Sequence, residues 1–150
     1  MQITADLELK IGDVLKNKGI EDNGRVQQFI DSECIRLMYD YTPNRNGILN
    51  ASVRINTVIG EGMLKQYTPY ARYQYYGKLY VDPITLKGAF YSDKYGFWSR
   101  PGVAKIPDPG GRMLNYSQIK SPKAGRLWFE RMKADHKENI RKGAIKVANK

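Results

Sequence analysis

The chain has 150 residues, enough for one domain with a hydrophobic core, and its 11% aromatic content is too high for a disordered chain. Lys and Arg number 25 against 15 Asp and Glu, which gives a net charge of +10 with the single histidine neutral. One cysteine and one histidine exclude an internal disulfide framework and a zinc site built from Cys and His ligands.

The charge is unevenly distributed along the chain. Residues 1–40 contain five basic and eight acidic side chains, whereas residues 41–120 contain eleven and four, and residues 121–150 nine and three. This asymmetry suits head-to-tail contact between copies or docking on an anionic partner, and it is equally compatible with an ordinary solvated surface. No apolar run approaches the roughly 18 residues of a membrane span, and the start lacks signal-peptide features, so a cytoplasmic protein is expected.

The N-terminal part predicts one ambiguous element and one clear helix. Residues 2–11 alternate loosely, which favours a strand, although a helix fits as well. Apolar residues recur every three or four positions over 26–41 and predict a helix capped by Asn23 and ended by Pro43. Cys34 lies on this apolar stripe and is expected to be buried and inert.

The middle of the chain predicts short elements separated by turns. Residues 48–59 alternate between apolar and polar and predict a half-buried strand. Residues 60–62 then form a turn, and residues 63–67 are expected to return as the hairpin partner. Residues 68–77 predict a short helix with Thr68 as cap and Gly77 as exit, followed by a strand over 79–81.

The C-terminal half predicts a long irregular excursion and a final helix. Glycines and prolines interrupt every period over 83–120, and a hairpin is expected near 88–99. Residues 124–148 carry an apolar stripe that includes His136, with Trp128 and Phe129 as core anchors. We therefore predict a single α+β domain over 1–150, in which a long N-terminal helix and a C-terminal helix pack on a small antiparallel sheet.

Few residues suggest chemistry. Asp82, Asp93 and Asp108 are able to meet as a metal site only if three turns converge, and turns commonly contain Asp for local reasons. His136 has no associated nucleophile or carboxylate motif, so a packed or interface histidine is expected. We assign no catalytic residue, cofactor or metal ion, and we expect no enzymatic activity.

Aromatic residues are the stronger signal, because six of the eleven tyrosines lie within 67–80. Aromatic rings beside Arg72 and Lys78 are able to stack single-stranded bases, but two cations are few for a nucleic-acid groove, and such residues are also enriched between subunits. We expect a subunit interface here and in the excursion. The candidate interface residues are Tyr70, Arg72, Tyr73, Tyr75, Tyr76, Tyr80, Phe90, Tyr91, Phe97 and Trp98.

The C-terminal helix supplies an alternative, a small basic DNA- or RNA-binding protein. Its candidate nucleic-acid-facing residues are Arg131, Lys133, Lys137, Arg141 and Lys142. The same side chains are also compatible with the solvated side of an amphipathic helix.

Four segments resemble the minor capsid proteins of long-tailed bacteriophages of Gram-positive bacteria, a group of head–tail connector, neck or tail-completion proteins. They are residues 23–27, residues 43–49 followed by Ser52, residues 69–73 with Gly77, and residues 127–137. In order and spacing they extend over about two thirds of the chain, and the last segment is the most specific.

The resemblance implies a structural role without catalysis. Such proteins have a small α+β fold and assemble as rings between portal and tail, with double-stranded DNA passing through the hole without sequence recognition. The implied partners are further copies of the chain and the portal, connector and tail proteins, with no membrane. The implied location is the virion head–tail junction, after assembly in the host cytoplasm.

Overall fold

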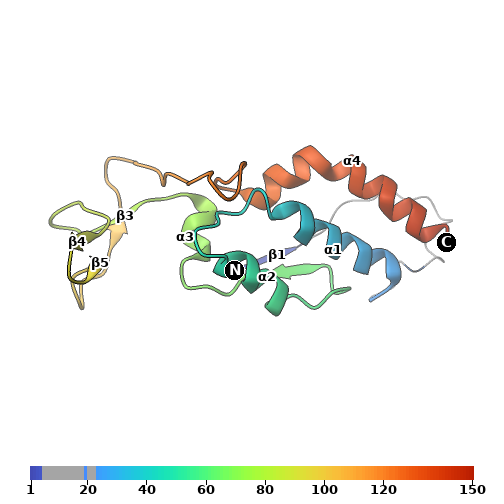
Figure 1. The fold of residues 1–150 in the computed structure, drawn as a ribbon, viewed down its shortest axis with the longest axis horizontal. Helices are drawn as coiled ribbons and strands as arrows, with labels where there is room; N and C mark the ends of the chain where they lie inside the picture. Colours follow the sequence, from blue (N-terminus) through green and yellow to red (C-terminus); the bar gives the residue numbers. More distant parts are fainter. Residues whose placement is uncertain (5–18, 20–22) are drawn as a thin grey trace.

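A computed structural model describes residues 1–4, 19 and 23–150, and these have the predicted α+β composition (Figure 1). The elements in chain order are β1 (Gln2–Thr4), α1 (Arg25–Met38), α2 (Ile48–Asn56), β2 (Met63–Lys65), α3 (Ala71–Tyr76), β3 (Tyr80–Val81), β4 (Phe90–Ser92), β5 (Gly96–Trp98), β6 (Ile106–Pro107) and α4 (Trp128–Ala148). Figure 1 shows a helical body and an arm that projects from one end of it. We define the arm as residues 80–112 and the body as the other described residues.

Helices α1 and α4 run antiparallel along the body and supply most of its core (Figure 1). Their buried apolar residues follow the predicted stripes: Val26, Ile30, Cys34 and Met38 on α1, and Trp128, Phe129, Met132, Ile140 and Ala144 on α4. Gly143 allows close contact, because a Cβ there would lie 2.5 Å from the Phe29 ring. Arg25 donates hydrogen bonds to the carbonyl oxygens of Val147 and Ala148, both at 3.2 Å, and so caps the end of α4.

The ends of α1 differ from the prediction. Gly24 is the N-cap, whereas Asn23 has a left-handed φ of 63° and its amide donates to the Gly60 carbonyl at 3.1 Å. The helix ends at Met38, before the turn that contains Pro43. There the amide and the hydroxyl of Thr42 both donate to the Met38 carbonyl at 2.9 Å, which satisfies a terminal backbone acceptor.

Residues 48–56 form a helix, so the predicted strand over 48–59 is wrong. Leu49 and Val53 are buried, four residues apart, and Ser52 is buried beside them, whereas Ile55 is exposed. Strand alternation would have placed Ile55 with Leu49 and Val53. Positions 49 and 53 share a face in either geometry, and burial against the body selects the helical period.

Strand β2 pairs antiparallel with β1, with Gln2 opposite Lys65 and Thr4 opposite Met63. The prediction of a strand within 63–67 is confirmed, but its expected hairpin partner is wrong because that segment is α2. Strand β1 confirms part of the segment predicted over 2–11, whose residues 5–11 lie outside the described residues. The described strands form three separate two-stranded pairs, and α1 packs mainly on α4.

The turn predicted over 60–62 is confirmed, and a buried carboxylate holds it against α1. Asp31 is fully buried and accepts hydrogen bonds from the backbone amides of Gly60 at 2.7 Å and Gly62 at 3.1 Å. The Gln27 side chain donates to its other oxygen at 2.7 Å. The carboxylate therefore replaces the water that these buried donors would otherwise require.

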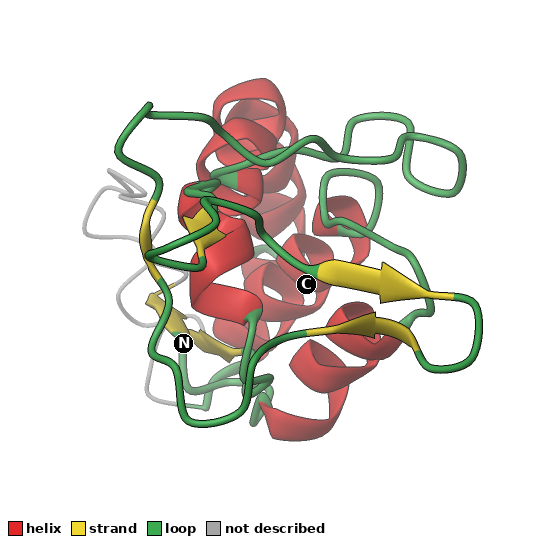
Figure 2. Cartoon of the chain, turned by 90° about the vertical axis from the view of Figure 1, so that its left-hand side faces the viewer, coloured by secondary structure: helices red, strands yellow, loops and turns green. Residues whose placement is uncertain are grey.

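The arm is built from two antiparallel pairs. Strands β3 and β6 pair at its base, with Tyr80 opposite Pro107, and β4 and β5 form the hairpin predicted near 88–99. The rest of 83–120 lacks regular structure apart from β6, in agreement with the predicted excursion. Figure 1 shows the hairpin at the end of the molecule remote from α1 and α4, and Figure 2 shows its two strands side by side in front of the helices. None of the described helices has the length and apolar content needed to cross a membrane.

Candidate functional site

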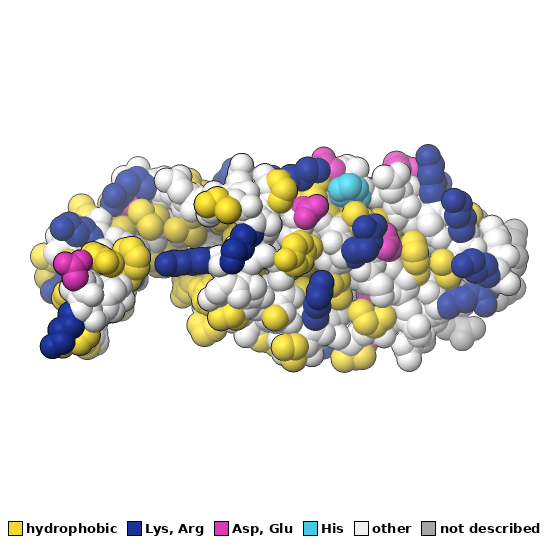
Figure 3. All heavy atoms as spheres, in the orientation of Figure 1, with side chains coloured by type: hydrophobic (Ala, Val, Ile, Leu, Met, Phe, Trp, Pro, Cys, Tyr) yellow, Lys and Arg dark blue, Asp and Glu magenta, His cyan; other side chains and the backbone are white. Residues whose placement is uncertain are grey.

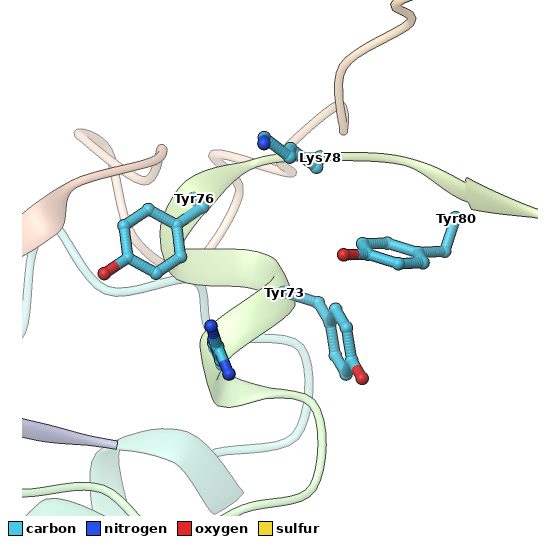
Figure 4. Close-up of a pocket in the computed structure, with 5 residues that line it drawn as sticks. Tyr73, Tyr76, Lys78 and Tyr80 are labelled. Carbon is cyan, nitrogen blue, oxygen red and sulfur yellow. The ribbon is translucent and has the colours of Figure 1, made fainter. Parts of the chain in front are cut away.

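A pocket of about 370 Å³ lies between α3 and the base of the arm (Figure 4). Its lining residues are Arg72, Tyr73, Tyr76, Lys78 and Tyr80. Five of the residues predicted from the tyrosine-rich segment, counting Lys78, thus surround one cavity. We call it the tyrosine pocket.

Helix α3 presents these side chains because its opposite face is buried. Ala71 and Tyr75 are four residues apart and both enter the core, where the Tyr75 ring meets the Trp128 ring edge-on at 4.8 Å. Tyr75 is therefore a core residue and not the interface residue that the sequence predicted. Burial raises the pKa of its hydroxyl to about 12. The neighbouring Arg72, Tyr73 and Tyr76 are left exposed.

The helix ends as predicted at Gly77, which has a left-handed φ of 71°. A Cβ at this position would lie about 3 Å from side-chain atoms of Tyr116 and Arg126, so both conformation and space favour glycine. At the other end Tyr70 is the N-cap and no side chain caps the helix, so the predicted cap at Thr68 is wrong. After Gly77 the chain changes direction, so that Lys78 and Tyr80 also line the pocket (Figure 4).

Aromatic contact fixes the wall that α3 shares with the arm. The rings of Tyr73 and Tyr80 meet edge-to-face at 4.7 Å, which joins α3 to β3. A second, mainly apolar cavity of about 610 Å³ shares Tyr73, Lys78 and Tyr80 with the tyrosine pocket. It continues past Tyr70 and Leu114 to Lys105, so the two cavities adjoin at the three shared residues, and we call the pair the groove beside the arm.

The other predicted interface residues lie on the hairpin of the arm. Tyr91 and Phe97 are 63% and 67% exposed, and Trp98 is 44% exposed. Phe90 is half-buried because its ring stacks on Trp98 at 4.8 Å. These cross-strand aromatic pairs leave a large apolar surface in contact with solvent, which is typical of interaction sites.

An ion pair between the buried Asp82 and the partly exposed Arg100 holds the arm in shape. The Arg100 guanidinium donates two hydrogen bonds to the Asp82 carboxylate, at 2.5 and 2.7 Å, and the amides of Ile84 and Thr85 donate to the same group. The bond from Arg100 is the main cause that holds the pKa of Asp82 well below its usual range. Such a bidentate contact between a guanidinium and a carboxylate is among the stronger hydrogen-bond geometries.

Arg100→Ala is expected to loosen the arm and leave the body intact. Hydrogen exchange of arm amides should accelerate roughly tenfold, because two charge-assisted bonds are lost, while the melting temperature changes little. The pKa of Asp82 is lower in the folded protein than in the unfolded chain, where it is about 3.9. The ionised Asp82 therefore contributes its full stabilisation above about pH 3.9 and loses it only as the pH falls further, toward the folded-state pKa. Exchange corrected for the intrinsic rate at each pH should show this loss begin below about pH 3.9 in the parent protein, and to a smaller extent in the variant, whose Asp82 still accepts from two backbone amides. Equal arm protection in both proteins would contradict this role.

The basic residues of α4 do not form a single face. Lys133, Lys137 and Arg141 recur every four residues and lie along one side, whereas Arg131 and Lys142 lie on another. Arg131 is engaged within the body, since its guanidinium donates to the Lys123 carbonyl at 2.9 Å. Arg141 lies 3.4 Å from the Glu138 carboxylate. A phosphate-facing surface on α4 thus contains at most three neighbouring cations of the predicted five.

The only histidine joins a hydrogen-bonded cluster between α1 and α4. Tyr41 is buried and donates to the Asp135 carboxylate at 2.5 Å, while its oxygen lies 3.2 Å from His136 Nε2 and 3.1 Å from Lys123 Nζ. Burial and the bond to Asp135 raise the pKa of Tyr41. His136 is half-buried against the Tyr41 ring, which agrees with the first of the two predicted alternatives, a packed or an interface histidine.

The other candidate catalytic or metal-binding groups are either buried alone or paired with a neighbouring arginine. Asp82 and Asp108 bind Arg100 and Arg112 respectively, so the acids of the excursion do not converge. Cys34 is fully buried, and burial raises the pKa of its thiol to about 12. Within residues 1–4, 19 and 23–150, no group of three or more His, Cys, Asp or Glu side chains is placed to hold a metal ion.

Sequence patterns did not indicate Lys105 or Leu114 as part of the groove. Both lie in the irregular excursion, distant in sequence from α3, and no local period marks them. Lys105 reaches the groove from the returning side of the arm, where its ammonium donates to the Gly88 carbonyl.

Comparison with known proteins identifies no relative. No family model, no curated protein and no solved structure matches the chain.

Proposed function

We propose that the chain is a non-enzymatic structural subunit of a bacteriophage particle, which assembles as a ring at the head–tail junction between portal and tail. The four segments that resemble minor capsid and connector proteins support the phage assignment. The observation that carries the assembly role is the aromatic hairpin of the arm, which leaves Tyr91, Phe97 and Trp98 exposed in the single chain.

The exposed hairpin surface is stabilised when another molecule covers it. Burying apolar area contributes about 25 cal/mol per Å², so an exposed aromatic hairpin gains free energy when it docks on another molecule. The hairpin projects from one end of the elongated body (Figures 1 and 2). A contact between this end and a different surface of the next copy is head-to-tail, and such contacts close into rings when the rotation permits.

The test is deletion of the gene from the phage genome that encodes the chain, followed by complementation. We expect DNA-filled heads without attached tails, restored to infectious particles by the parent chain. Tyr91→Ser combined with Phe97→Ser should fail to restore them, because the docking surface is lost, while the purified variant melts like the parent. Ile119→Ser is the matched control, since Ile119 is 92% exposed outside the arm and its variant should complement.

Complete, infectious particles formed without the chain would overturn the proposal, as would turnover of a substrate by the purified protein. Immunogold labelling away from the head–tail junction would refute the location. Full complementation by the hairpin variant would refute the role of the arm.

A second candidate function, nucleic-acid binding through α4, is favoured by the row formed by Lys133, Lys137 and Arg141. A duplex bound by this row should lose affinity steeply with salt, by a logarithmic slope of up to about 3, because each phosphate contact releases counterions. A slope near zero would remove this candidate.

A further inference from the structure

The tyrosine pocket combines cations and aromatic rings in a way that the assembly role does not require. We propose that it binds single-stranded nucleic acid, with an unpaired base against the tyrosine rings and the adjoining phosphates at Arg72 and Lys78. This proposal is independent of the ring assembly.

The charge of the pocket favours an anion. Arg72 and Lys78 both line it, and neither forms an ion pair or side-chain hydrogen bond with another residue of the described part of the chain. By contrast, Arg36, Arg100 and Arg112 each bind a neighbouring carboxylate. No acidic residue lines the tyrosine pocket or the adjoining cavity, and Lys105 adds a third cation to the groove. Two or three cations without a counterion in one concave site attract phosphate or carboxylate groups.

The aromatic rings distinguish between these anions. Tyr73 and Tyr76 are 47% and 50% exposed, and both line the pocket beside the two cations. The edge-to-face contact with Tyr80 holds Tyr73 in position before any ligand arrives. An acidic peptide would use the cations and leave the rings without a planar partner. A nucleotide uses both, because every base has a π face and every linkage carries a charge.

The shape of the site favours a single strand. In a duplex the base faces are stacked on each other, so only an unpaired base is able to reach rings inside a pocket of about 370 Å³. The adjoining cavity of about 610 Å³ continues the groove past Lys78 toward Lys105 and offers room for the neighbouring nucleotide. Figure 3 shows Lys and Arg side chains, in dark blue, at the hollow between arm and body.

The test is fluorescence anisotropy of the full chain with a labelled oligothymidylate of about ten nucleotides, titrated at several salt concentrations. The parent protein should bind the single strand at least about tenfold more tightly than a duplex of equal length. Arg72→Ala with Lys78→Ala should lower the logarithmic salt slope by about 1.4, since each single-strand phosphate contact contributes about 0.7. Lys133→Ala with Lys137→Ala removes the same charge from α4 and should change the slope for single strands little.

Stacking is tested separately from charge. Tyr73→Leu and Tyr76→Leu should each weaken binding about tenfold without changing the salt slope, and Tyr73→Phe should restore affinity because the ring is retained. Both tyrosines are exposed, so the variants should melt like the parent protein.

Three outcomes would overturn the proposal: no binding of the single strand, equal affinity for single strand and duplex, or equal losses in the pocket and α4 double variants. The last would indicate attraction by net charge alone. An aspartate- and glutamate-rich peptide that binds more tightly than the oligonucleotide would assign the pocket to a protein partner instead. None of these results depends on particle assembly, so the proposed function and this proposal fail separately.

Discussion

Trp128→Ala is expected to lower the free energy of unfolding by about 3–5 kcal/mol, the usual cost of removing a buried aromatic side chain. Trp128 is fully buried at the start of α4, where its ring contacts Tyr75 of α3. Its indole N–H donates to Gln66 Oε1 at 3.2 Å, and the Gln66 amide donates to the Leu49 carbonyl at 3.3 Å. The substitution therefore opens a cavity and breaks a buried polar connection at once.

Urea denaturation followed by circular dichroism measures this loss, and two variants separate its causes. Trp128→Phe retains a ring but leaves Gln66 Oε1 without its donor, so a smaller loss of about 1–3 kcal/mol is expected. Trp98→Ala is the matched control, because Trp98 is partly exposed on the arm and should cost less than about 1 kcal/mol. A Trp128→Ala variant that unfolds at the parent urea concentration but fails to assemble would show that Trp128 belongs to an interface instead.

Asp31→Ala has the second-largest expected effect, a loss of about 2–4 kcal/mol in the free energy of unfolding. The alanine leaves the buried amide of Gly60 and the adjacent amide of Gly62 without an acceptor, and it removes the partner of the Gln27 side chain. An unpaired buried donor costs more than the net gain from an ordinary hydrogen bond, because its water is not replaced.

Asp31→Asn tests whether the hydrogen bonds or the charge matter more. Asparagine keeps one acceptor oxygen for the two backbone amides, so a loss of about 1 kcal/mol is expected if geometry dominates. Hydrogen exchange gives the local result: the amides of residues 60–62 should exchange faster in the alanine variant than in the asparagine variant. Alanine and parent proteins of equal stability and equal protection would contradict the structural role of this carboxylate.

The long helices were predictable because their signal is local. The buried residues of α1 and α4 recur every three or four positions over several turns, and no strand pattern produces the same series. The hairpin of the arm was predictable for a similar reason, since turn-forming residues separate two short aromatic segments. The helix boundaries were less so, because Asn23 has a left-handed φ and binds Gly60 instead of capping α1, and α1 ends at Met38, well before Pro43.

Helix α2 shows where local pattern fails. Its nine residues satisfy a strand period and a helical period almost equally, and burial of Leu49, Ser52 and Val53 decides for the helix. The partner of β2 is also decided non-locally, since its register joins residues 2–4 to residues 63–65. Chain pattern carries no information about which distant segment lies opposite.

In the candidate site too, one part was predictable from the sequence and another was decided by tertiary packing. The cluster of tyrosines and Arg72 within 67–80 marked the region, but only the packing of Tyr75 on Trp128 decided which rings face solvent. Lys105 joins the groove through the return of the arm, held by Asp82 and Arg100. By itself the sequence determined the two main helices, the α+β class and the aromatic arm, because these depend on spacing within one segment. Tertiary structure alone decided the state of α2, the strand partners and the shape of the tyrosine pocket, because burial against distant residues outweighs weak local preference.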